Sequence, residues 1–216
     1  SSGLVDRVDV SHYRLAVHLT LACVILALTV WTAGAVLARE GPRAVPRSRA
    51  AASDAAARRP GRGLALAATV LLGAILAQIF LGGLVAGLDA GLASNTWPLM
   101  NGALVPPGLL ELSPWWMNPL ENPLTVQFDH RMFGYVLWLL ALGHAVVAWR
   151  TEPRSDAAVR AVVIVAALTA QVAIGVATVL LSVETGAALL HQVTGGVLVW
   201  LAAWHAQRTI AARRTA

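Results

Sequence analysis

The segment FDHRMFGYVLWLLALGHAVVAWR, residues 128–150, decides the fold class. Its central run, Met132–Trp149, contains no Asp, Glu, Lys or Arg and is long enough for a helix that crosses the ~30 Å hydrocarbon layer of a bilayer. Histidines stand near both ends of this run, at positions 130 and 144. The segment therefore predicts a transmembrane helix that carries candidate metal ligands.

Four further apolar runs have the same character. They lie at Tyr13–Ala38, Leu64–Leu88, Ala157–Val183 and Ala187–Ala206. The chain of 216 residues is 57% hydrophobic and 12% charged, whereas about a quarter of the residues are charged in a typical soluble domain. We therefore expect an all-α integral membrane protein with five transmembrane helices.

The distribution of arginine predicts the orientation in the membrane. The formal net charge of +5 comes from sixteen arginines, because the chain contains no lysine. They gather in the connections 39–62 and 150–160 and in the C-terminal tail, whereas the connection 89–127 and the turn at Glu184 contain none. Basic loops stay in the cytoplasm, so we expect the C-terminus inside and the N-terminus of this chain outside. The basic charge thus reports orientation and does not indicate nucleic-acid binding.

The same pattern divides the chain into four parts. Residues 1–38 form the first span with an outer lead-in, 39–63 a cytoplasmic linker rich in Arg, Ala and Pro, 64–208 the remaining four spans, and 209–216 a cytoplasmic tail. The long outer loop, 89–127, contains three tryptophans, which prefer the headgroup region. Because the chain starts outside without a signal peptide, we expect it to be a piece of a longer protein with further helices upstream.

Three histidines are predicted to lie at similar depth near the outer face. His130 opens the third span, and His18 and His191 each lie about one turn into the first and fifth spans. Ionisable residues inside a membrane are candidates for function, and two imidazoles on facing helices can bind a haem iron axially. The three histidines are therefore the candidate metal ligands of this chain.

Small residues follow these histidines at the spacing of one helical turn. Gly134 and Gly195 lie four residues after the histidines of the third and fifth spans, on the same helix face. A porphyrin held edge-on between helices needs such space, and Arg131 and Arg14 could pair with its propionates. The alternative is that the histidines join helices by hydrogen bonds and that the glycines only permit close packing.

Two more histidines are candidates for a second pair of metal ligands. His144 and His205 follow His130 and His191 by fourteen residues, which returns to almost the same helix face ~21 Å deeper. An inner pair of haem ligands is therefore available. The four-residue pattern of small residues is kept only at Ala148, however, so we favour interfacial polar residues near the cytoplasmic ends.

A short internal repeat accompanies the histidines. Gln78 precedes Gly82 by four residues in the second span, and Gln171 precedes Gly175 at the same spacing in the fourth. Paired repeats are common in membrane proteins.

Four strings in the chain resemble the haem A synthase family, in its mitochondrial and proteobacterial branch. They are YRLAVHL (13–19), GLVAGLDAGLASNTWPLMNG (83–102), ENPLTVQFDHRMFGY (121–135) and ALLHQVTGGVL (188–198). The resemblance implies an eight-helix protein of two halves related by a pseudo-twofold axis. Spans two to five would form its C-terminal half, an antiparallel four-helix haem-binding bundle, and span one would be the last helix of the N-terminal half.

The resemblance also implies an activity, the oxidation of a methyl group of haem O to the formyl group of haem A for the assembly of terminal oxidases. His130 and His191 would be the axial ligands of a haem b cofactor, and His18 would bind the iron of the substrate haem O. The partner of His18 and the catalytic residues, among them a glutamate, are expected upstream. Where the other half carries that glutamate, this chain has Gln127.

The expected setting is the bacterial inner membrane, with the mitochondrial inner membrane as the alternative. Expected partners are membrane lipid, haem O, haem O synthase as a candidate, and an electron-transfer partner that the sequence does not identify. Homo-oligomer formation stays open. The competing functions are a bis-histidine b-type membrane cytochrome with one or two haems, and a transporter whose histidines only pack helices.

Overall fold

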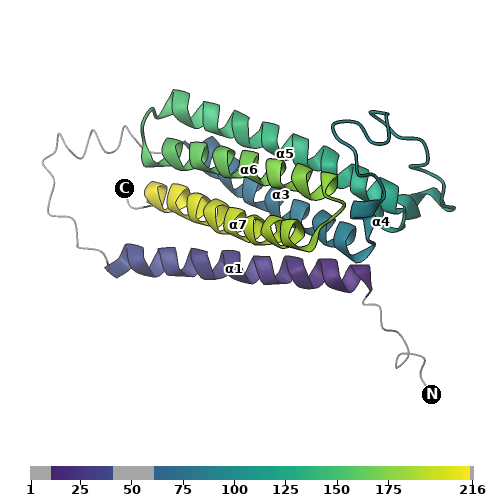
Figure 1. The fold of residues 1–216 in the computed structure, drawn as a ribbon. Helices are drawn as coiled ribbons and strands as arrows, with labels where there is room; N and C mark the ends of the chain where they lie inside the picture. The colour runs from purple at the N-terminus through teal and green to yellow at the C-terminus, as the bar shows by residue number, and fades with distance from the viewer. Residues whose placement is uncertain (1–10, 41–60, 215–216) are drawn as a thin grey trace, which may run out of the picture. The chain divides into compact units, whose positions relative to one another are not determined.

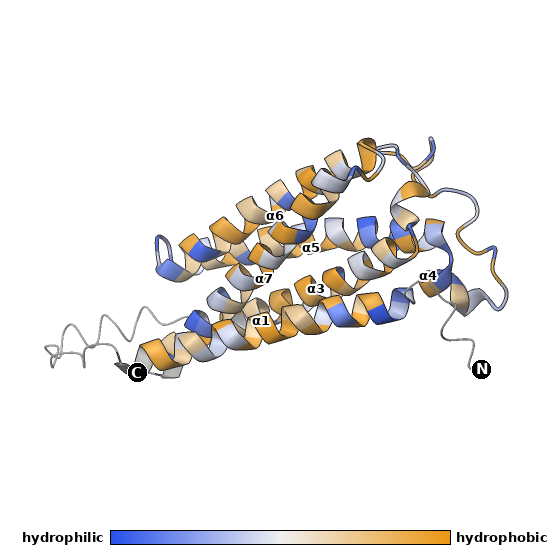
Figure 2. Cartoon of the chain, turned by 60° about the horizontal axis from the view of Figure 1, so that its bottom comes forward, coloured by the Kyte–Doolittle hydropathy of each residue, from blue (hydrophilic) through white to orange (hydrophobic). Residues whose placement is uncertain are grey.

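The computed structural model describes residues 11–40 and 61–214. This part of the chain is all-α, with five long helices, α1 (His12–Glu40), α3 (Arg62–Gly87), α5 (Pro123–Thr151), α6 (Asp156–Leu180) and α7 (Thr185–Arg214) (Figure 1). Each is long and apolar enough to cross a membrane, and Figure 2 shows hydrophobic residues along all of them. The five predicted spans are therefore confirmed. Residues 41–60, most of the predicted linker, lie outside the described residues.

Two helices differ in extent from the predicted spans. α5 begins at Pro123, about two turns before the apolar run at Met132. Its polar first turns are stable as helix because the side-chain oxygen of Asn122 accepts the N–H groups of Leu124 and Thr125, at 3.0 and 3.4 Å, and because proline suits the first helical position. His130 therefore lies two turns inside α5 and does not open it.

α7 extends beyond the predicted span, which ends at Ala206, and continues to Arg214. Thr209 in this extension is fully buried, and its hydroxyl donates to the backbone carbonyl of His205 at 2.7 Å. Residues 209–214 of the predicted tail are thus helical. Alanine and arginine, which are good helix formers, make up most of this extension.

By their internal contacts the residues form two compact units. Among the described residues, the first comprises 11–23, 76–136 and 170–195, and the second comprises 24–40, 61–75, 137–169 and 196–214. Each long helix contributes one portion to each unit. The units carry different polar groups, and each is described separately.

In the first unit, α1 and α3 cross in close contact. A Cβ atom added to Gly83 would lie 2.6 Å from Cα of Ala16, and one added to Gly87 would lie 2.5 Å from Cα of His12. Two glycines at this four-residue spacing let helix backbones approach inside a membrane. Only glycine fits at these positions, because the atoms that it meets belong to the backbone of α1.

The loop of the first unit is organised by two buried asparagines. It contains the short helices η1 (Ala90–Leu92), η2 (Trp115–Met117) and α4 (Asn118–Glu121). The Asn118 side chain accepts the N–H of Leu112 at 3.0 Å and donates to the carbonyls of Leu112 and Trp115, and Asn122 donates to the carbonyl of Gly108 at 2.9 Å. These bonds satisfy loop backbone groups that would otherwise lack partners near the membrane.

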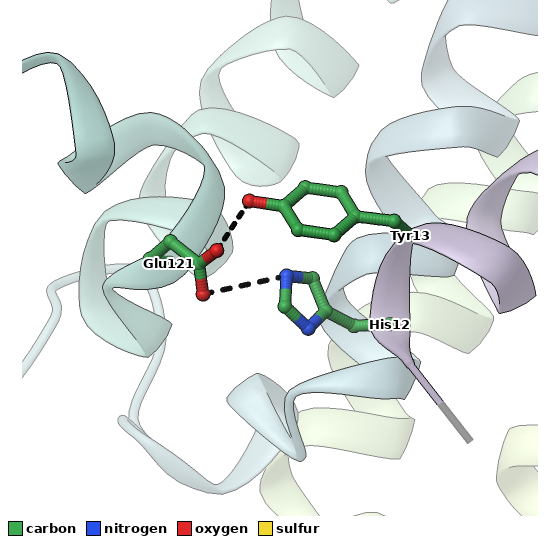
Figure 3. A network of polar contacts seen from close by, with 3 residues as sticks. All are labelled: His12, Tyr13 and Glu121. Carbon is green, nitrogen blue, oxygen red and sulfur yellow. Dashed lines mark hydrogen bonds and ion pairs between the residues drawn. The ribbon is translucent and has the colours of Figure 1, made fainter. Parts of the chain in front are cut away.

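A polar contact also joins α1 to this loop. The hydroxyl of Tyr13 donates to Oε1 of Glu121, and Nε2 of His12 lies 3.5 Å from its other oxygen (Figure 3). His12 is therefore part of a contact between the first turn of α1 and α4.

The second unit has a core of small residues. Leu64 packs with Ala145, Ala148 and the buried alanines at 157, 158 and 161. Trp138 donates its indole N–H to the hydroxyl of Thr169 at 2.9 Å. Alanine-lined contacts let the helices approach closely without a large apolar driving force, as is usual inside a bilayer.

Gly83→Val is expected to separate α1 from α3 and to lower the free energy of unfolding by about 1–3 kcal/mol, because overpacking forces backbone shifts. The measurement is thermal unfolding of the detergent-purified chain, followed by circular dichroism. Gly73→Val is the matched control on the same helix, because a Cβ added there meets no atom within 4 Å. Equal melting temperatures for both variants would contradict the close crossing.

Glu184 is expected to make the start of α7 sensitive to acid. Its carboxylate accepts the N–H of Ala187 at 2.9 Å, and hydrogen bonds from the backbone N–H groups of Gly186 and Ala187 lower its pKa. A lowered folded-state pKa contributes stability that is complete above the ordinary Glu value of about 4.3 and is lost as the pH falls through the folded-state pKa.

The test compares melting temperatures of the wild type and Glu184→Gln as the pH falls from neutrality to about pH 3. The melting temperature of the wild type should fall more than that of the variant in the acid range. Above about pH 5 the melting temperatures of the two proteins should change with pH to the same extent. Parallel curves throughout would show that this carboxylate does not stabilise the folded chain.

Candidate functional site

The first candidate site, called the outer pair after its predicted side of the membrane, is built from one histidine on each of two helices of the first unit. His130 on α5 and His191 on α7 are half-buried, and their ring centroids lie 6.5 Å apart with the rings inclined by 78°. Bonds between a metal and an imidazole nitrogen are about 2 Å long, so two rings on one metal have centroids roughly 6 Å apart. The spacing of this pair therefore fits a shared metal.

Each of these histidines is held by a glutamine from the preceding long helix. Nε2 of Gln78 on α3 donates to the backbone carbonyl of His130 at 3.0 Å and lies 3.2 Å from its Nδ1. Nε2 of Gln171 on α6 donates to the carbonyl of His191 at 2.8 Å and lies 3.2 Å from its Nδ1. The repeat in the sequence thus corresponds to a repeated contact between a glutamine and a histidine. The sequence did not predict that these residues would be in contact.

The glycines of the repeat lie directly against the imidazoles. A Cβ added to Gly82 would lie 3.2 Å from Cε1 of His130, and one added to Gly175 would lie 2.8 Å from Cε1 of His191. Sequence reasoning noted both glycines only as members of a repeat. They allow each ring to approach the neighbouring helix.

The glycines that were predicted to clear space for a porphyrin have different neighbours. A Cβ added to Gly134 would lie 3.3 Å from Nε2 of Gln78, and one added to Gly195 would lie 3.4 Å from Nε2 of Gln171. In this structure the glutamine amides therefore lie beside Gly134 and Gly195. The small residues make room for the amides that hold the histidines.

Arg131 contacts the outer loop. Its guanidinium donates to the carbonyls of Ser94 and Thr96, at 2.7 and 2.9 Å. One turn earlier, Gln127 is buried and donates to the carbonyls of Gly91 and Ser94, both at 3.0 Å. These residues join α5 to the loop, and a contact between Arg131 and a haem propionate stays a prediction.

The structure does not bring His18 to the outer pair. His18 and Arg14 are exposed on α1, whereas Ala16 and Cys23 on the same helix are buried. The exposed face also carries large apolar residues, such as Leu21 and Ile25. His18 therefore belongs to a helix face that no other described element of this chain covers.

The inner histidines form a buried pair in the second unit. His144 is 7% and His205 0% exposed, and their Nε2 atoms lie 2.8 Å apart, at hydrogen-bond distance. The two residues are therefore buried partners of each other, and their favoured place near the cytoplasmic ends of the helices stays a prediction. Two imidazoles are a donor set suited to haem iron, but nitrogens that share a metal lie about 4 Å apart. Their Nδ1 atoms lack hydrogen-bond partners among the described residues.

Within residues 11–40 and 61–214, no group of three or more His, Cys, Asp or Glu side chains is arranged to hold a metal ion. The candidate ligands that this part of the chain brings together are the two histidine pairs. The outer pair has the spacing of a shared metal, and the inner pair has that of a hydrogen bond.

Comparison with known proteins identifies relatives of this chain. The chain is 47% identical to a protein named Heme A synthase from Chelativorans sp. (strain BNC1), 46% to one from Rhizobium meliloti (strain 1021) and 45% to one from Agrobacterium fabrum. The matches cover 97%, 93% and 95% of this chain but 54%, 50% and 52% of these relatives. The chain thus spans about half the length of the curated relatives it matches.

A second comparison concerns the family as a whole. Residues 1–204 match the family COX15-CtaA, which is described as cytochrome oxidase assembly protein. Because this match extends over most of the 216 residues, the chain belongs to the COX15-CtaA family of cytochrome oxidase assembly proteins.

Proposed function

We propose that this chain is the haem b-binding portion of a haem A synthase, with His130 and His191 as axial ligands of the cofactor. The observation that carries the proposal is the matched pair of histidines, 6.5 Å apart, each held by a glutamine from the neighbouring helix. The relatives named Heme A synthase, 45–47% identical over more than 90% of this chain, support the assignment. The last four long helices are then an antiparallel haem-binding bundle, the C-terminal half of an eight-helix protein.

The glutamines fit a ligand-holding role on chemical grounds. A neutral imidazole that binds a metal through Nε2 carries its proton on Nδ1, which then needs an acceptor. Oε1 of Gln78 is buried and has no hydrogen-bond partner in the described part of the chain. A turn of this amide would present that oxygen to Nδ1 of His130, so the residues present can hold a haem.

The two glutamines differ in how firmly they are held. The hydroxyl of Thr194 donates to Oε1 of Gln171, so the amide of Gln171 is fixed from both ends. Gln78 is fixed only through its nitrogen. The His130 side of the site therefore has more freedom to adjust its hydrogen bond than the His191 side.

The proposed reaction is the oxidation of a haem O methyl group to the formyl group of haem A. A haem held by two histidines supplies a one-electron redox centre when bound. In this chain, His130 and His191 would hold that group, and Gln78 and Gln171 would orient the imidazoles. Arg131, which donates to carbonyls of the loop in this structure, would contact a propionate. His18 and Arg14 contribute to the substrate site from the exposed face of α1. The other wall of the substrate site and the catalytic residues come from the rest of the protein.

The proposed setting is the bacterial inner membrane, with the N-terminus of this chain outside and the C-terminus in the cytoplasm. The distribution of arginine supports this orientation. Membrane lipid, haem O synthase and an electron-transfer partner are the proposed partners.

A second candidate function is a b-type membrane cytochrome that transfers electrons through two haems. The buried pair of His144 and His205 favours it, because each residue follows an outer histidine on its own helix by fourteen positions. Two haems in the chain would require these rings to separate from their hydrogen-bond distance of 2.8 Å.

His130→Leu and His191→Leu are each expected to abolish binding of haem b, because one axial ligand is lost. The measurement is the Soret absorbance per protein after purification with haem supplementation. His144→Leu is the matched control, a buried histidine replaced on the same helix, and should keep one haem per chain. Loss of haem in His144→Leu with retention in His130→Leu would move the cofactor to the inner pair.

Gln78→Leu is expected to weaken haem retention roughly 10–100-fold, because partners of ligand histidines typically contribute that much to affinity. The measurements are the rate of haem transfer to an apoprotein acceptor and the midpoint potential of the bound haem. Gln207→Leu removes another buried glutamine, in the second unit, and should change neither. An unchanged potential and transfer rate in Gln78→Leu would exclude a positioning role.

A further inference from the structure

The second unit contains a pocket of about 510 Å³ between α3 and α7. Its lining residues are Arg62, Ala65, Leu66 and Thr69 of α3 and Ile210 and Arg213 of α7. We propose that this pocket binds one anionic phospholipid, with the phosphate between the two arginines and an acyl chain along the apolar wall. The proposal is independent of the haem sites.

The pocket is charged at one end and apolar along the rest, which matches an amphiphilic ligand. Arg62 is the first residue of α3, and Leu66 and Thr69 follow at intervals of four and three, on the same helix face. On α7, Arg213 lies one residue before the helix end and Ile210 one turn before it. Both arginines thus lie at helix ends, and the apolar residues lie further along each helix.

The charged residues that line the pocket are both arginines, although the carboxylate of Glu152 accepts a hydrogen bond from the backbone of Gly61, next to Arg62. The lining of the pocket includes no carboxylate, and the ion pair found in the described part of the chain joins His12 and Glu121 in the first unit. Nearby on α7, Arg208 stacks over the ring of Trp204, with its guanidinium carbon 5.3 Å from the ring centroid. Two arginines in one pocket whose lining has no carboxylate favour an anion between them.

A phospholipid matches the pocket better than a free anion. Guanidinium groups bind phosphate oxygens through paired hydrogen bonds, and basic pockets between transmembrane helices on the cytoplasmic side bind anionic headgroups. The arginine distribution predicts that side for both arginines. A free phosphate would leave the surface of Leu66, which is 66% exposed, and of Ile210 uncovered, whereas an acyl chain would cover it.

The test counts lipids retained by the purified full chain. The protein is reconstituted in nanodiscs of phosphatidylcholine and phosphatidylglycerol in equal amounts, transferred to detergent and analysed by native mass spectrometry. The wild type should retain one phosphatidylglycerol, and the double variant Arg62→Gln/Arg213→Gln should retain it roughly tenfold less. Arg150→Gln/Arg154→Gln, which removes the same charge at exposed arginines outside the pocket, should retain it as the wild type does.

A second variant separates the pocket from general charge attraction. Leu66→Trp fills the apolar wall and keeps both arginines, so it should also release the lipid while the helical circular dichroism stays unchanged. The proposal is overturned if the two double variants lose lipid equally, if phosphatidylcholine is retained as well as phosphatidylglycerol, or if Leu66→Trp keeps the lipid. It is also overturned if inorganic phosphate raises the melting temperature of the wild type as much as phosphatidylglycerol does.

Discussion

The requirement that a polar side chain inside a bilayer have a polar partner explains the contacts of both histidine pairs in this chain. Imidazoles and amides lose water when they enter the membrane, and an unpaired group is unfavourable by several kcal/mol in an apolar medium. The outer histidines meet this requirement through glutamines, and the inner histidines meet it through each other. The different partners give the two pairs different chemistry, since a glutamine can turn with its histidine, whereas a paired imidazole must be displaced before it can bind anything else.

The glutamine contacts also explain the repeat of small residues. An imidazole can approach a neighbouring helix only where that helix lacks a side chain, as at Gly82 and Gly175, and an amide can reach back only where the other helix is small, as at Gly134 and Gly195. Each contact between a histidine on one helix and a glutamine on the neighbouring helix therefore needs a glycine on both helices. The four-residue spacing follows from the helix period, since residues one turn apart lie on one face.

The sequence predicted the spans well because a membrane helix must be apolar along its whole length. All five apolar runs correspond to helices. Helix ends were predicted less well, because capping decides them. Asn122 and Pro123 start α5 in a polar stretch that hydropathy does not mark. Of the three histidines predicted to lie at similar depth, His130 and His191 are paired in the structure, whereas His18 is exposed on α1. The pairing of His144 with His205 depends on how two helices face each other, which periodicity on one helix does not show.

The crossing of α1 and α3 also limits how this family can vary. In most helix contacts a larger side chain on one helix can be offset by a smaller one on the other, so that the two positions change together. Gly83 and Gly87 meet the Cα atoms of Ala16 and His12, and no substitution in α1 shortens a backbone. Mutation at these two glycines therefore has no compensating partner residue. We expect these two glycines to be invariant among relatives. They should show no covariation with residues of α1, although covariation usually reveals a helix contact in alignments.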